Sequence, residues 1–297
     1  MRTLFLATAA ACTLASGAFA TTINTISNVV FIVDESGSMS GEQAFLENTV
    51  IGSLDSELAA AGVTDRSYGV IGYGGPSNGV PRLFGSASLD DATDTQTNLS
   101  NLVTSGGFED GYEAIRFALD TLTFTAGAAV NFILVTDEDR DIRPGSSLTA
   151  QSIQNTLTSA NILLNVIVNN PFTSPDAAGA NLLGVNNTGT GYLADGMGGY
   201  SEVANGTVGN GSGTTETDYV DVALATGGAA WDLNQLRAGG STAESFTDAF
   251  IDIKVGEIIS QPPTGPGPEV VPLPAAAWML LAGIGSLGAL SRRRKAA

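Results

Sequence analysis

Apolar runs with the character of buried strands alternate along this chain with segments whose apolar residues recur at helical spacing. The strand-like runs are 29–33, 67–73, 130–136 and 162–168. The helix-like segments are 42–61, 109–122, 148–159 and 241–259. Strands that are apolar on both faces belong in a parallel sheet covered by helices on each side. The alternation therefore predicts an α/β fold with a doubly wound, mostly parallel sheet and helices on both faces.

Shorter patterns complete this prediction. They are an edge strand at 82–86, a short helix at 95–103 and a last strand at 227–233. From Asn170 to about Asp218 the periodicity gives way to Gly, Asn, Thr and Ser, which predicts an insertion or a long loop. Apolar residues at 182–185 and 192–193 indicate that part of this segment, 170–218, packs against the body.

Two of the apolar runs end in residues of types that commonly bind cations. The first ends in Asp34, followed by Ser36 and Ser38, and another ends in Thr136-Asp137. Ligands bind at the carboxyl ends of the strands in open parallel sheets, and carboxylate and hydroxyl oxygens suit Mg²⁺ and Ca²⁺. Alternatively, Asp34 and the two serines only cap the following helix, because Asp and Ser are favoured N-caps. The pattern predicts either a divalent-cation site or a helix cap.

The Asp34-x-Ser36-x-Ser38 pattern resembles the first loop of the metal-ion-dependent adhesion site of von Willebrand factor type A (VWA) domains, and Thr136-Asp137 matches the third loop. The resemblance covers about residues 28–259 and implies a Rossmann-like VWA fold over 26–260. It also implies one Mg²⁺ or Ca²⁺ ion held by Asp34, Ser36, Ser38 and Asp137. In this family an acidic side chain of the partner takes an open position on the ion.

The second loop of the site departs from the family pattern. The family usually has a threonine after two glycines, but here Gly106 and Gly107 are followed by Phe108, which cannot bind a cation. Either Glu109 or Asp110 replaces the threonine, or the site is incomplete and binds metal weakly. Both acids also suit the first turn of the helix at 109–122. Glu109 is the fifth candidate ligand.

Composition excludes several kinds of chemistry. The chain contains no histidine, which excludes Ser-His-Asp triads and the commonest zinc sites. Gly75-x-Ser77-x-Gly79 matches a hydrolase elbow only formally and suits an ordinary turn. Asp and Glu total 30 against 12 Lys and Arg, and the net charge of −18 disfavours nucleic acid and anionic lipid as partners. We therefore expect a binding module and not an enzyme.

The amino-terminal residues 1–20 have the form of a secretory signal peptide. A charged start and an apolar middle precede Ala18-Phe19-Ala20, after which cleavage is expected. The single cysteine, Cys12, lies within this segment, so the mature chain is expected to fold without disulfides. The protein is therefore expected to be exported.

The carboxyl-terminal residues 270–297 have the form of a sorting signal. A Pro/Gly linker at 261–269 leads to the uncharged segment 270–290, which is long enough to cross a bilayer, and then to the basic cluster 292–295. With these features, five residues resemble the VPLPA-type sorting signals of Gram-negative bacteria, which are relatives of the PEP-CTERM signals: Val271, Pro272, Leu273, Pro274 and Ala275. The resemblance implies processing by an exosortase, an integral-membrane enzyme. The alternative is an ordinary single-pass anchor.

These features together predict an exported VWA-type binding module that recognises an extracellular protein or matrix partner. The carboxyl-terminal segment is expected to hold it in the membrane at least transiently, with the body on the periplasmic or extracellular side of a Gram-negative bacterium. The alternative is a structural extracellular-matrix protein in which the fold persists but the cation site is degenerate and free of metal.

Overall fold

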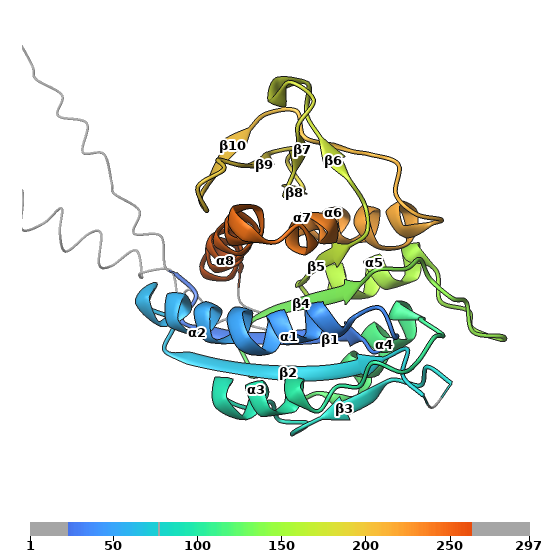
Figure 1. Cartoon of the computed structure of the whole chain (residues 1–297). Coiled ribbons are helices and arrows are strands. Elements are labelled where there is room, and N and C mark those ends of the chain that lie inside the picture. The colour runs from blue at the N-terminus through green and yellow to red at the C-terminus, as the bar shows by residue number, and fades with distance from the viewer. Residues whose placement is uncertain (1–22, 77, 263–297) are drawn as a thin grey trace, which may run out of the picture.

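The four strand-like runs form the centre of a nine-stranded sheet in the computed structural model, which describes residues 23–76 and 78–262 (Figure 1). The strand order is β10-β9-β8-β12-β5-β4-β1-β2-β3. The central strands run parallel to one another: β12 (Ala229–Asp232), β5 (Ile162–Val168), β4 (Ala129–Thr136), β1 (Ile26–Asp34) and β2 (Asp65–Tyr73). Strand β3 (Arg82–Phe84) pairs antiparallel at one edge. The predicted mostly parallel α/β sheet is confirmed.

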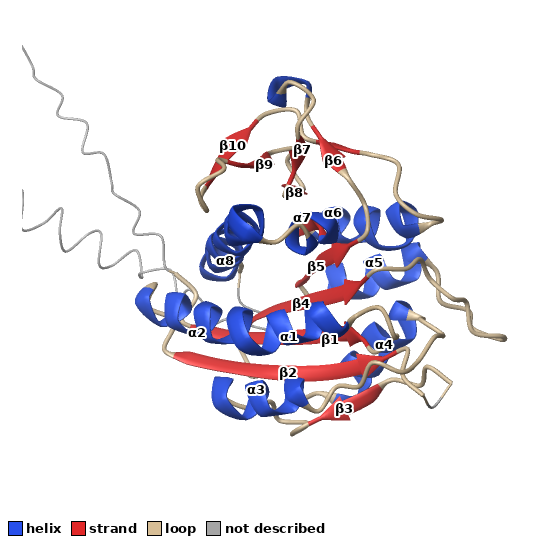
Figure 2. Ribbon diagram, in the orientation of Figure 1, coloured by secondary structure: helices blue, strands red, loops and turns tan. Residues whose placement is uncertain are grey.

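Helices cover both faces of the sheet, as Figure 2 shows. One face carries α4 (Gly111–Thr121), α5 (Ala150–Ser159) and α6 (Asp221–Thr226). The other face carries α1 (Ser40–Phe45), α2 (Ile51–Ala60), α3 (Ala92–Ser100) and α8 (Gly240–Ser260). Short turns of helix fill in between these elements: η1 (Leu46–Val50), η2 (Pro175–Ala177), η3 (Glu216–Val220) and α7 (Leu233–Arg237).

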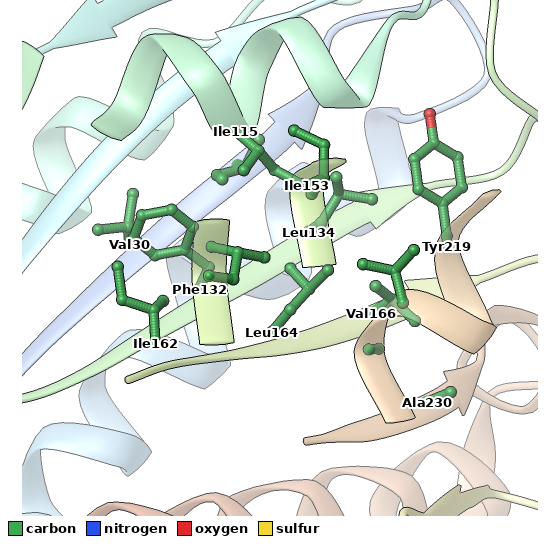
Figure 3. Packing of buried hydrophobic residues seen from close by; sticks show 14 of the residues in the cluster. Val30, Ile115, Phe132, Leu134, Ile153, Ile162, Leu164, Val166, Tyr219 and Ala230 are labelled. Carbon is green, nitrogen blue, oxygen red and sulfur yellow. The ribbon is translucent and has the colours of Figure 1, made fainter. Parts of the chain in front are cut away.

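The alternation of side chains along β1 explains the two layers of core. Val30 and Ile32 face the side of α4 and α5, whereas Phe31 faces the side of α2 and α8. In Figure 3, Ile115 of α4 and Ile153 of α5 meet side chains of β1, β4 and β5. Because every residue from Val29 to Val33 is fully buried, the strand had to be apolar on both faces.

The predicted first helix, 42–61, is a continuous helical run made of α1, the π-helical turn η1 and α2. Its buried stripe includes Leu46, Val50, Leu54 and Leu58. The run ends at Gly62, whose φ of +91° is readily adopted only by glycine and lets the next amide bond back to the carbonyl of Leu58. The helix therefore stops where the sequence predicted.

The segment 170–218 is not a long loop but a set of short strands. They are β6 (Phe172–Thr173), β7 (Asn181–Leu182), β8 (Gly184–Asn186), β9 (Gly191–Ala194), β10 (Tyr200–Val203) and β11 (Thr207–Val208). Strand β8 pairs antiparallel with β12, so β8 to β10 extend the main sheet, while β6, β7 and β11 form a small second sheet. These strands have two to four residues, which is too short for a period-2 pattern to emerge from the sequence.

The described chain enters and leaves at the amino ends of the parallel strands. The backbone amide of Asn24 donates to the carbonyl of Ile259 at 2.9 Å. The Gln261 side chain donates to the carbonyls of Val130 and Asn161 at 3.1 and 2.6 Å, at the starts of β4 and β5. The described part of the chain therefore begins and ends on the side of the sheet opposite to the carboxyl ends of the strands (Figure 1).

Several predicted segments lie outside the described residues. They are the signal peptide 1–20 with Cys12, the greater part of the linker 261–269 and the whole of 270–297, including Val271 to Ala275. Among residues 23–76 and 78–262, no helix is both long and apolar enough to cross a membrane. The predicted transmembrane helix at 270–290 stays a prediction.

Candidate metal centre

The predicted cation ligands lie at the carboxyl ends of two adjacent strands. Asp34 is the last residue of β1, and Asp137 directly follows β4, the neighbour of β1 in the sheet. Asp34 is fully buried, while Ser38 is exposed to solvent. The site therefore extends from the sheet edge to the surface.

A chain of hydrogen bonds links four of the predicted ligands. Asp34 Oδ1 accepts from the Ser36 amide at 2.7 Å, and Ser36 Oγ lies 3.2 Å from Ser38 Oγ. Ser38 Oγ donates to Asp137 Oδ1 at 2.9 Å. The structure thus brings Asp34, Ser36, Ser38 and Asp137 together, although their positions in the sequence span more than one hundred residues.

The helix-cap alternative does not hold for this loop. The N-cap of α1 is Met39, which makes no side-chain capping bond. Asp34 bonds within its own turn instead, and its Oδ2 accepts from Thr136 Oγ1 at 2.9 Å. The aspartate and the serines therefore point their oxygens at one another and not at the helix terminus.

The structure gives different surroundings to the three residues that follow the glycines in the second loop of the site. The Phe108 ring is partly exposed and lies under the Arg143 guanidinium, 5.2 Å from its centre. Asp110 caps α4 and forms a buried ion pair with Arg140, 2.6 Å between Oδ1 and Nε. Glu109 lies beside Asp34, because a Cβ atom placed on Gly74 would be 2.8 Å from Asp34 Oδ1 and 3.0 Å from Glu109 Cγ. Of the three, Glu109 is the one that faces the predicted ligands.

The donor set fits a hard divalent cation. Glu109 is only 2 % exposed, and its Oε2 has no hydrogen-bond partner. Gly74 lets Asp34 and Glu109 lie this close to the backbone, since a Cβ atom there would be only 2.8 Å from Asp34 Oδ1. In the described parts of the chain, no group of three or more His, Cys, Asp or Glu side chains could hold a metal ion. A cation here therefore needs the hydroxyl oxygens of Ser36 and Ser38 as well as carboxylates.

Two further residues belong to the site, and neither was among the predicted ligands. Thr136 is 1 % exposed and holds Asp34 Oδ2. Arg237, at the end of α7, donates to Asp137 Oδ2 at 2.9 Å and to Glu42 Oε1 at 2.6 Å. The Thr136-Asp137 pair was visible in the sequence, but nothing in the pattern around Arg237 indicated that α7 would bring it to this loop.

Burial makes the carboxyls of this site hard to ionise in the absence of a cation. Burial, the largest cause, raises the pKa of Asp34 from its ordinary 3.8 to about 7, against the opposing hydrogen bonds from Ser36 and Thr136. Burial, followed by the charge of Asp34 and a side-chain hydrogen bond with Glu138, raises the pKa of Glu109 to about 9. A divalent cation held by these residues would reverse this balance, because it would favour the charged form of both groups.

We expect the cation-free protein to lose stability as the pH rises from about 4 through about 7 and on toward 9. Over that range the folded state keeps protons on Asp34 and Glu109 that the unfolded state has released, so raising the pH favours unfolding. Thermal melts in EDTA across this range measure the effect. The matched control is the Asp34→Asn, Glu109→Gln double variant, in which this part of the decline disappears. The expectation is contradicted if the melting temperature of the unmodified chain falls with pH no more steeply than that of the double variant.

The carboxyl-terminal segment matches a known signal. Residues 270–295 match the PEP-CTERM protein-sorting motif, which implies processing by an exosortase. No curated protein is significantly similar to the chain as a whole. The motif indicates export and membrane-associated sorting of the protein.

Solved structures similar to this chain include VWA domains. The VWA domain of SpRpn10 is 12% identical, with a TM-score of 0.37, over 48% of this chain and 75% of that one. An aerotolerance-related membrane protein from Bacteroides fragilis is 15% identical, with a TM-score of 0.44, over 78% and 99%. A von Willebrand factor type A protein from Catenulispora acidiphila is 18% identical, with a TM-score of 0.33, over 48% and 33%. The chain thus joins a PEP-CTERM sorting motif to an α/β body whose structural neighbours include VWA domains.

Proposed function

We propose that this protein is an exported, surface-delivered binding module that recognises an extracellular protein or matrix partner through a divalent-cation-dependent site. The observation that carries the proposal is the hydrogen-bonded chain from Asp34 through Ser36 and Ser38 to Asp137, beside Glu109, whose Oε2 has no hydrogen-bond partner. These are oxygen ligands of the kind that Mg²⁺ and Ca²⁺ prefer.

The residues of the site have separate roles in this proposal. Asp34 supplies the buried negative charge, and Thr136 fixes its carboxylate by donating to Oδ2. Ser36 and Ser38 offer neutral oxygens, and Asp137 orients the Ser38 hydroxyl by accepting a hydrogen bond from it. A bound cation would supply a positive charge that a carboxylate oxygen of the partner coordinates. We propose binding and not catalysis, in a chain that has no histidine.

The direction of the site suits a protein held by its carboxyl terminus. Gln261 fixes the exit of the chain at the amino ends of β4 and β5, whereas Asp34 and Asp137 lie at the carboxyl ends of the strands. With the tail in or near a membrane, the site faces outward. The body then lies on the periplasmic or extracellular side of a Gram-negative bacterium, where an extracellular partner is accessible.

A structural matrix protein without a metal site is the second candidate. Two observations favour it: Phe108 stands where the family usually has threonine, and Arg237 already neutralises Asp137 at 2.9 Å. In that case the α/β body serves as a scaffold, and partner binding does not depend on a cation.

Pull-down of the exported protein from its native matrix, with and without EDTA, separates the two candidates. If the site works as proposed, EDTA removes the partner and added Ca²⁺ or Mg²⁺ restores it. The matched variant is Ser36→Ala, Ser38→Ala, which keeps every charge but removes the neutral ligands, and it should lose the partner in the presence of cation. Retention of the partner in EDTA, together with retention by this variant, supports the scaffold and rejects the cation-dependent site.

A further inference from the structure

Glu109 is a buried acid that no basic side chain neutralises. It is 2 % exposed, its Oε2 is unpaired, and it shares the space over Gly74 with a second buried acid, Asp34. A buried carboxylate without a counter-charge is strongly unfavourable, since its lost hydration is not replaced. Two such groups side by side require either protons or a cation between them.

The nearby arginines are committed to other groups. Arg140 pairs with Asp110, Arg82 with Glu35, and Arg237 with Glu42 and Asp137. Among the ion pairs of the described residues, none involves Glu109 or Asp34. The two acids therefore have no counter-charge of their own, whereas Asp110, Glu35, Glu42 and Asp137 each have one.

Resting on the function proposed above, we propose that Glu109 makes the site selective for Ca²⁺ over Mg²⁺. Glutamate offers two charged oxygens on a long side chain, and Glu109 directly follows Phe108, which stands where the family resemblance expects the single neutral oxygen of threonine. Ca²⁺ accepts six to eight oxygens in flexible geometry, including both oxygens of one carboxylate. Mg²⁺ demands a near-ideal octahedron of six short bonds and keeps several waters.

The surroundings of Asp137 strengthen this assignment. Arg237 holds Asp137 Oδ2 and Ser38 holds Oδ1, so this carboxylate is less free to bind a cation directly. The direct negative ligands are then Asp34 and Glu109, with Ser36 and Ser38 as neutral ones. In such a site the Glu109 carboxylate is a charged ligand with two oxygens, and its removal weakens the binding of Ca²⁺ more than that of Mg²⁺.

Calorimetric titration of the purified full-length chain with CaCl₂ and with MgCl₂ tests the proposal. We expect the unmodified chain to bind Ca²⁺ at least about tenfold more tightly than Mg²⁺. The Glu109→Thr variant should lose most of that preference, because its affinity for Ca²⁺ falls. Asp120→Asn is the control for loss of one negative charge outside the site, because Asp120 is exposed and pairs with Arg116. It should leave both affinities unchanged.

A second variant protects the test against a folding defect. Glu109→Gln keeps the size of the side chain and removes its charge, so it should melt at a higher temperature than the unmodified chain in EDTA and show the same loss of preference for Ca²⁺. An unchanged ratio of the two affinities in both variants, or tighter binding of Mg²⁺ by the unmodified chain, overturns the inference and leaves the proposed function intact. Failure of the unmodified chain to bind either ion overturns both.

Discussion

Replacement of Asp34 by alanine is expected to abolish divalent-cation binding while the protein stays folded. Asp34 is the only predicted ligand that is completely buried, and its two oxygens organise both the Ser36 amide and the Thr136 hydroxyl. Loss of a direct ligand costs more than the 10- to 100-fold typical of residues behind the ligands, so we expect affinity to fall by more than about 100-fold. Calorimetric titration with Ca²⁺ and Mg²⁺ measures the loss.

The fold should survive because the Asp34 carboxylate is not a stabilising group in the cation-free protein. Its raised pKa, about 7, shows that burial disfavours its charge. The matched control is Asp139→Asn, which removes one charge from the loop after β4 without touching a predicted ligand, since Asp139 bonds to Thr214. Undiminished cation affinity in the Asp34 variant, in a sample with a normal circular dichroism spectrum, would falsify the site.

Replacement of Arg140 by alanine is expected to cost about 3–5 kcal/mol of unfolding free energy, the range typical when one partner of a buried ion pair is removed. The side chains of Arg140 and Asp110 are 3 % and 0 % exposed, and they bond through both guanidinium nitrogens that face the carboxylate. Arg140 also lies 4.2 Å from the centre of the Tyr112 ring. Without it, Asp110 is left charged and buried in front of α4.

Denaturant unfolding monitored by circular dichroism measures this cost. Arg116→Ala is the control, because Arg116 pairs with Asp120 at 2.8 Å but both side chains are more than half exposed. An exposed pair of this spacing on a helix contributes about 0.3–0.5 kcal/mol, so the control should be nearly neutral. Equal losses of unfolding free energy in the two variants would contradict this prediction. The buried pair would then stabilise the fold no more than the exposed pair does, and Asp110 would not be committed to Arg140.

The candidate cation site was only partly predictable. The residues of the first and third loops follow buried strands, and a strand end fixes where the next side chains point, so Asp34, Ser36, Ser38 and Asp137 could be placed together in advance. The second loop has no such strand before it. Glu109 and Asp110 are adjacent and equally acidic, and only the location of Arg140, which takes Asp110, decides that Glu109 is the one beside Asp34.

By itself, the sequence determined the parallel core, its helical layers and the edge at which the polar residues gather, because these follow from periodicity and from residue types that are local in the chain. The tertiary structure alone decided that the segment 170–218 extends the sheet, since its strands are too short to show a period and gain their partners from β12. It also decided that Arg237 lies on Asp137, one hundred residues away, because that contact depends on how α7 packs and not on any pattern near either residue.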